Sequence, residues 1–127
     1  MAKGYTATLT GGQEIYIPTW PPLVALENLS KAGEFIGTDN LLRISELSIP
    51  AVILAITESP NSKETAGLIQ HFVCTARMDD VKITRQEFER IFEDDLYLIC
   101  ELFAHVVKGV YSDFFVRGLA KGPSPKD

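Results

Sequence analysis

Residues 80–115 read DVKITRQEFERIFEDDLYLICELFAHVVKGVYSDFF, and this stretch decides the fold class. Between Leu96 and Val110, apolar side chains recur at steps of three and four residues, which is the spacing of one face of an α-helix. That face is widened by Tyr97, Leu98 and Leu102, and the polar positions left are Glu101, His105 and Lys108. An ordinary surface helix carries a whole charged flank. We therefore expect this helix to be central in the fold or to use its second side as an interface.

A shorter helix is predicted just before it. Thr84-Arg85-Gln86-Glu87 has the pattern of a capping box, in which the threonine oxygen accepts a hydrogen bond from the N–H group three residues on. The side chains expected to face inward from this helix are Phe88, Ile91 and Phe92. Asp94 and Asp95 fall between the two helices, where carboxylates favour the positive end of the next helix dipole.

The N-terminal segment predicts a β-hairpin over residues 5–17. Two stretches alternate in the two-residue period of a strand, and Gly11 and Gly12 supply the turn between them. Proline then ends the pairing, because it offers no N–H to a ladder. Trp20 stands among Pro18, Pro21 and Pro22, so it is either a staple that clamps the hairpin to the first helix or an aromatic contact for a partner.

Helices are also predicted through the middle of the chain. The first begins at Pro21 or Pro22, and its expected apolar face is Leu23, Leu26, Leu29 and Ala32 or Gly33. Thr38-Asp39-Asn40 predicts the start of the next helix, and Pro50 fits the first turn of a helix over 51–57. Ser62 is the expected cap of the helix that follows. Residues 81–83 form either a strand fragment or an extended link.

These elements predict a mainly α (α+β) fold, a small helical domain with an N-terminal β-hairpin. We expect one globular domain over residues 1–117, with the hairpin at 5–17 and helices across 21–115. Residues 118–127 lack periodicity and contain Gly-Pro-Ser-Pro, so a flexible C-terminal tail is expected there.

Charge and composition exclude several partners. The formal net charge of −5 argues against nucleic acid, because binding its backbone requires clustered Lys and Arg. The most apolar internal run, residues 49–56, is far shorter than the ~20 residues that span a bilayer, and no signal peptide is expected. Cys74 and Cys100 lie in apolar surroundings without a CxxC pair, which predicts buried free thiols and a cytosolic compartment.

No catalytic, cofactor or metal site is predicted. His71 and His105 are the two histidines, and neither has a second ligand at a metal-binding spacing. The Asp79-Asp80 and Asp94-Asp95 pairs lack the surrounding pattern of a calcium loop, so turns and caps explain them better. Because no serine stands in a nucleophile-elbow motif, we expect a protein that is not an enzyme.

The order of these elements resembles the small tail assembly chaperones of long-tailed bacteriophages. Similar features are the opening hairpin, the proline and leucine-bearing helix that follow, residues 83–96 before an apolar helix, and the aromatic close at 111–115. Residues 41–57 depart most from that pattern. The resemblance implies a protein of the host cell cytoplasm that binds the tape measure protein and assists tail assembly without entering the virion.

A partner-binding surface follows from the resemblance together with the surplus of apolar side chains. The residues expected to form it are Trp20, Tyr97, Leu98, Leu102, Phe114 and Phe115. The expected partner is the phage tape measure protein or another tail protein, with a homo-oligomer also open. The alternative is a structural tail or baseplate subunit that stays in the virion tail and buries the same surface against another copy.

Overall fold

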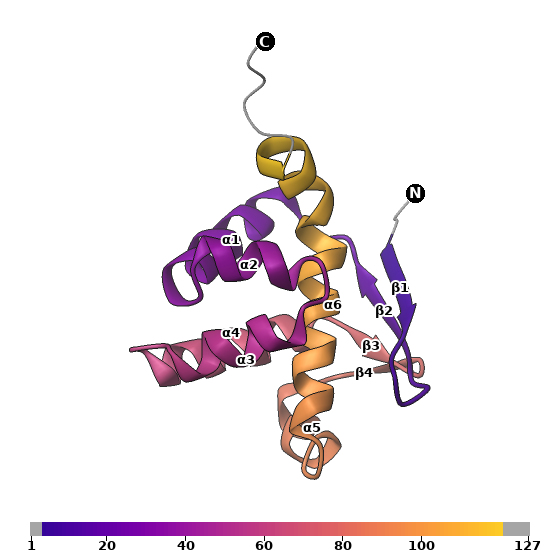
Figure 1. Ribbon diagram of the computed structural model, residues 1–127. Helices are drawn as coiled ribbons and strands as arrows, with labels where there is room; N and C mark the ends of the chain where they lie inside the picture. The colour runs from indigo at the N-terminus through magenta and orange to yellow at the C-terminus, as the bar shows by residue number, and fades with distance from the viewer. Residues whose placement is uncertain (1–3, 121–127) are drawn as a thin grey trace.

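The computed structural model describes residues 4–120, and Figure 1 shows helices gathered around one long helix with a small sheet on one side. The strands are β1 (Gly4–Thr8), β2 (Glu14–Pro18), β3 (Arg77–Met78) and β4 (Val81–Lys82). The helices are α1 (Pro22–Phe35), α2 (Thr38–Ile44), α3 (Ile49–Thr57), α4 (Ser62–Val73), α5 (Arg85–Ile91) and α6 (Leu96–Phe115). A short π-helix, η1 (Val116–Ala120), continues α6. The predicted mainly α fold with an N-terminal hairpin is confirmed.

The sheet consists of two antiparallel hairpins joined in the order β1-β2-β3-β4. In the first hairpin Thr8 pairs with Glu14, and Gly12 has a positive φ of 94° that its missing Cβ permits. In the second, Met78 pairs with Val81 across a two-residue turn at Asp79 and Asp80. Both aspartates have positive φ, as a type I′ turn requires, and aspartate tolerates that region better than most residues. Residues 81–82 thus form a strand, and its partner β3 was not predicted.

Helix α6 is the centre of the fold. Helices α2, α3 and α4 and strand β1 all pack against it, and its middle turns are buried on every side (Figure 1). Phe103 is fully buried, and its ring lies 5.4 Å from the ring of Phe72 on α4, centroid to centroid. Two positions were predicted for this helix, one central in the fold and one with its second side at an interface. The middle of α6 occupies the central position.

The predicted inner face of α1 is right for Leu29 and Ala32 and wrong for Leu23 and Leu26. Leu23 is 74% exposed and Leu26 is also exposed, whereas Asn28 and Ala32 are buried. Ala25 and Leu29 complete the inner face, at steps of three and four residues. Small side chains let α1 approach its neighbours closely, and the hydroxyl of Tyr111 on α6 donates a 2.6 Å hydrogen bond to the Ala25 carbonyl. The spacing of the leucines alone does not show which side of α1 the neighbouring helices cover.

Helix caps agree with the sequence at the starts of α5 and α6, whereas α2 begins at Thr38 after Gly37 and has no side-chain cap from the expected Thr38-Asp39-Asn40 cluster. The Thr84 hydroxyl accepts a hydrogen bond from Glu87 N at 3.2 Å, and Asp95 accepts one from Leu98 N at 3.0 Å. The expected cap at Ser62 is not found, because α4 begins at that residue and its N-cap is Asn61. The Ser59 hydroxyl instead bonds Asn61 N and the buried hydroxyl of Thr65, which fixes the turn before α4.

The end of α6 extends past the body of the molecule. Helical structure continues through η1 to Ala120, so Gly118 and Leu119, expected in an irregular tail, belong to a helical turn. Arg117 forms a 3.3 Å ion pair with Asp113 one turn earlier. The rest of the expected tail, residues 121–127, lies outside the described residues.

Candidate partner-binding surfaces

One side of α6 holds the first hairpin through polar groups. Glu101 and His105, one turn apart, are both buried beneath it. The Glu101 carboxylate accepts hydrogen bonds from the backbone N–H of Thr10 at 2.9 Å and from its hydroxyl at 3.0 Å. His105 Nδ1 lies 2.9 Å from the Tyr5 hydroxyl. Two of the three polar positions of this helix, Glu101 and His105, therefore fix the hairpin rather than face water.

The ionisation of this seam follows from burial. Burial lowers the pKa of His105 below its usual 6.5, the Glu101 carboxylate acts in the opposite direction, and Lys108 lowers it further. Burial also raises the pKa of Tyr5. A neutral imidazole can accept a hydrogen bond from the Tyr5 hydroxyl, so the low pKa of His105 preserves this hydrogen bond near neutral pH.

Four of the six residues predicted for partner binding lie in the core. Trp20 packs edge-on against Phe72 of α4 and Tyr111 of α6, with centroid distances of 5.0 and 5.9 Å. It is therefore a buried aromatic anchor, but these contacts join the end of the hairpin to α4 and α6 rather than to the first helix as expected. The others that are buried are Leu98, Leu102 and Phe115. Their expected place on an exposed second face is corrected, because neighbouring elements already cover that side of α6.

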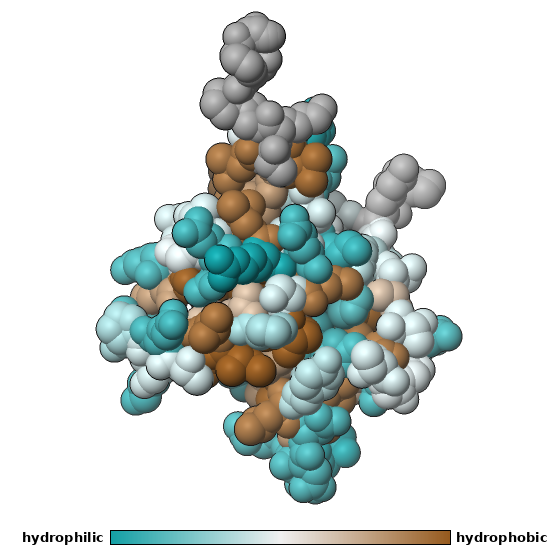
Figure 2. Space-filling view, viewed as in Figure 1, coloured by the Kyte–Doolittle hydropathy of each residue, from teal (hydrophilic) through white to brown (hydrophobic). Residues whose placement is uncertain are grey.

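The other two predicted residues are exposed, at opposite ends of α6. Tyr97 is next to the exposed Leu96 in the first turn, whereas Phe114 is 52% exposed in the last. Seventeen residues of helix separate them by about 25 Å, so one small contact does not include both. Near Phe114, Val116 and Leu119 are also exposed. We call Phe114, Val116 and Leu119 the C-terminal patch; Figure 2 shows brown surface around this end of the molecule, and Figure 1 shows α1 beside it.

Helix α3 carries a second apolar surface, which the sequence analysis missed. Its buried side consists of Ala51, Val52 and Ala55, whereas its larger side chains point outward. Ile53, Leu54 and Ile56 are 47%, 41% and 41% exposed. We call these three residues the α3 face. The signal was available in the sequence, because the small residues of this helix recur at one helical spacing and the large ones occupy the other side.

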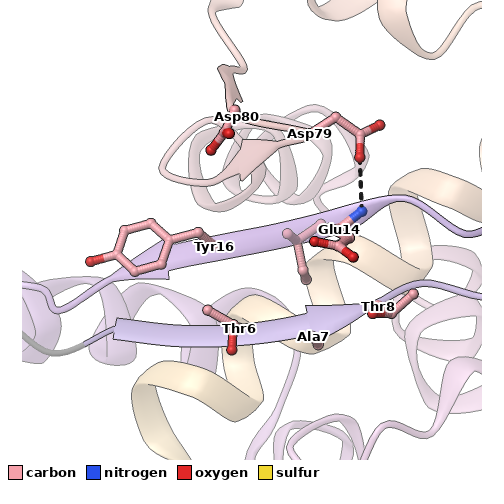
Figure 3. Close-up of a pocket in the computed structure, with 8 residues that line it drawn as sticks. Thr6, Ala7, Thr8, Glu14, Tyr16, Asp79 and Asp80 are labelled. Carbon is pink, nitrogen blue, oxygen red and sulfur yellow. Dashed lines mark hydrogen bonds between the residues drawn. The ribbon is translucent and has the colours of Figure 1, made fainter.

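The outer side of the sheet has a polar hollow of about 630 Å³. Figure 3 shows the carboxylates of Glu14, Asp79 and Asp80 there, with the hydroxyls of Thr6 and Thr8. Asp79 Oδ1 accepts a 3.0 Å hydrogen bond from Glu14 N, and Asp79 N donates to the Glu14 carbonyl at 2.7 Å. Asp79 therefore serves as a link between the two hairpins, as its turn position indicates.

Comparison with known families decides the identity. The family model described as phage tail assembly chaperone protein, TAC, matches residues 11–123, nearly the whole chain. The chain belongs to this family. No curated protein and no solved structure matched it. Membership in the phage tail assembly chaperone family confirms the resemblance drawn from the hairpin, the prolines and the apolar helix.

Over residues 4–120, no group of three or more His, Cys, Asp and Glu side chains could hold a metal ion. Cys74 and Cys100 are free and partly buried, and burial raises the pKa of both thiols. Within the same residues, no helix has the length and apolarity that crossing a membrane requires. Membership in a chaperone family suggests a role without catalysis, carried by surfaces rather than by a reactive centre.

Proposed function

We propose that this tail assembly chaperone binds the phage tape measure protein through the C-terminal patch and assists tail assembly in the host cell cytoplasm. The observation that carries the proposal is the exposure of Phe114, Val116 and Leu119 on a helix end that extends past the body. Several exposed large apolar side chains close together in the sequence, at the end of one helix, are typical of a binding site. An aromatic anchor beside aliphatic side chains is the composition of an interface centre.

The form of the patch supports a helical partner. A tape measure protein is long and helical by the family resemblance, and the apolar stripe of a helix can lie against a second helix through side chains three and four residues apart. The net charge of −5 also keeps the chaperone soluble while it exposes apolar side chains.

Co-purification tests the proposal. We expect Phe114→Ser to reduce the amount of tape measure protein recovered with the tagged chaperone at least ten-fold. Because Phe114 is half-exposed, the variant should keep the wild-type free energy of unfolding within about 0.5 kcal/mol. Val81→Ser, which replaces a 63% exposed side chain on β4, is the matched control and should recover the wild-type amount.

Two results would count against this contact. Undiminished recovery with Phe114→Ser would remove the C-terminal patch from the interface. Equal loss with Val81→Ser would indicate a nonspecific response to lost apolar surface rather than a defined site.

A further inference from the structure

The outer side of α3 is an apolar surface without a charge. The exposed side chains on this side are Pro50, Ile53, Leu54, Ile56 and Thr57, whereas Ile49 is partly buried against the core. Ile53 and Ile56, three residues apart, form a short aliphatic stripe, and Leu54 widens it. Figure 2 shows brown surface in the region where Figure 1 places α3. The inward side chains are small, so α3 packs closely on the body and leaves its larger side chains outside.

Acidic groups surround the C-terminal end of this stripe. Glu58 is the C-cap of α3, and it lines one cleft with Glu34 and another with Asp39. Arg43 is the one cationic side chain that lines these two clefts, against three carboxylates. The last turn of α3 also has no basic residue to complement the negative end of the helix dipole. The stripe therefore ends in a region of negative potential.

We infer that the α3 face is a docking site for an amphipathic helix of another protein that carries an aliphatic stripe followed by Lys or Arg. The stripe of the partner would cover Ile53, Leu54 and Ile56, and its cations would lie against Glu58 and the neighbouring carboxylates. Helix-in-groove recognition of this kind uses apolar anchors at i, i+3, i+4 and i+7. Charge at the rim then selects the partner and its direction.

A second copy of the chain fits this surface less well. A second copy would bring the same aliphatic side chains, with no basic residue in the last turn of α3 to meet the carboxylates. Two copies that meet through α3 in the same direction would also bring their Glu58 side chains together. The Glu58 carboxylate attracts the cations of a basic helix, whereas it would repel the Glu58 carboxylate of a second copy.

The inference is independent of the tape measure contact, because the α3 face and the C-terminal patch are on different helices. The probe is a synthetic helix with leucines at i, i+3, i+4 and i+7 and lysines at both ends. NMR titration of the whole protein should shift the amide signals of α3 and of Glu58. Ile53→Ser should weaken binding at least ten-fold, and Phe114→Ser should leave it unchanged.

Three results would overturn the inference: shifts that map away from α3, equal affinity for a peptide with glutamates in place of the lysines, or equal affinity with Ile53→Ser. A wild-type dimer in sedimentation experiments that Ile53→Ser converts to a monomer would also overturn it, because the occupant would then be a second copy. Mapping on the wild-type protein does not depend on whether a variant folds. If the peptide does not bind α3 but Phe114→Ser still reduces the recovery of tape measure protein, the inference fails and the proposed function stands.

Discussion

At the scale of single residues, stability depends on two kinds of position on α6. Large side chains such as Phe103 fill the core, and one glycine lets a neighbouring element come close. Gly109 faces the hairpin, where a Cβ atom would lie 2.8 Å from Cβ of Tyr5. Real Cβ contacts are longer than this, so the close approach of β1 to α6 depends on the missing side chain.

Gly109→Ala should therefore destabilise the protein by about 1–3 kcal/mol, the range for overpacking a well-packed contact. This loss would exceed the gain of about 1 kcal/mol that alanine brings to a helix interior. Gly67→Ala on α4 is the control, because nothing lies within 4 Å of its added Cβ and the same helical gain should appear as stabilisation. Urea unfolding measures both variants. Stabilisation of both by the same amount would show that β1 can move aside.

Phe103→Ala should cost about 3–5 kcal/mol, the usual effect of emptying an aromatic core site. The ring is fully buried and contacts Phe72, so its removal leaves a cavity that the surrounding helices cannot fill. Phe114→Ala, which truncates a half-exposed ring on the same helix, should change the free energy of unfolding by about 0.5 kcal/mol or less. Equal unfolding midpoints for the wild type and Phe103→Ala would contradict the central position of α6.

At the scale of elements, the main join is the seam between the first hairpin and α6. Its hydrogen bonds connect residues 91 and 100 positions apart in the chain, Thr10 to Glu101 and Tyr5 to His105. An isolated hairpin is marginal in water, and these bonds together with the buried Ile15 and Ile17 hold it in place. The seam also contains His105, whose pKa is lowered by burial.

Stability should fall as the pH falls below about 6.5, the ordinary pKa of histidine. Because burial lowers the pKa of His105, the unfolded chain takes up this proton at a higher pH than the folded protein does. The unfolded state then binds more protons, which lowers the free energy of unfolding by at most about 1.4 kcal/mol per pH unit for one group. Above that pH both states are neutral, and this effect disappears.

His105→Gln isolates the contribution, because glutamine can accept from Tyr5 but does not titrate. Urea unfolding at about pH 8 and about pH 5 should show a smaller loss of stability for His105→Gln than for the wild type. The pKa of His71 is also lowered, by burial and then by Arg85 and Lys31, but that residue is present in both proteins and cancels in the comparison. Identical pH dependence would mean that His105 does not titrate between the two states.

The sequence predicts elements well where the signal is local. The Thr-Gly-Gly turn, Pro50 and the Thr84 cap each mark a boundary through their own backbone chemistry, and each was found at the predicted place. On α3 the small and the large residues fall on opposite sides of the helix, so its buried side could have been recognised from the sequence. The buried side of α1 was not predictable in the same way, since Leu23 and Leu26 point outward although their spacing is that of an inner face. Only the position of the neighbouring helices decides that choice.

The candidate surface shows the same limit. Apolar spacing identified α6 but could not separate Leu102, which is in the core, from Phe114, which is exposed more than three turns beyond it. The burial of Glu101 and His105 was equally hidden, because their partners come from the distant hairpin. Strands β3 and β4 have two residues each, which is too short for the alternation of a strand to be recognised in the sequence.

At the scale of the whole molecule, the fold separates a packed centre from apolar surface at its ends. The core around α6 uses most of the large apolar side chains, and most of the exposed ones lie on α1, on α3 and in the C-terminal patch. Each of these surfaces is small compared with the roughly 800 Å² per partner of a stable complex. Contacts of this size are weak and exchange quickly, which suits a protein that binds a partner during assembly and leaves it afterwards.

Because such contacts exchange quickly, we expect the protein to be abundant in infected cells and absent from finished virions. As the tail tube closes around the tape measure protein, tube subunits would compete for the same apolar stripe with a much larger contact area, and the chaperone would be displaced. Quantitative mass spectrometry of purified virions should detect the tube protein and the tape measure protein but not this chain, whereas the lysate should contain all three. Recovery of this chain in a fixed ratio to the tube protein would favour the alternative of a structural subunit that packs as an oligomer in the virion tail. Sedimentation of the purified chain would then be expected to show stable oligomers, in which copies of the chain bury the exposed apolar side chains against one another.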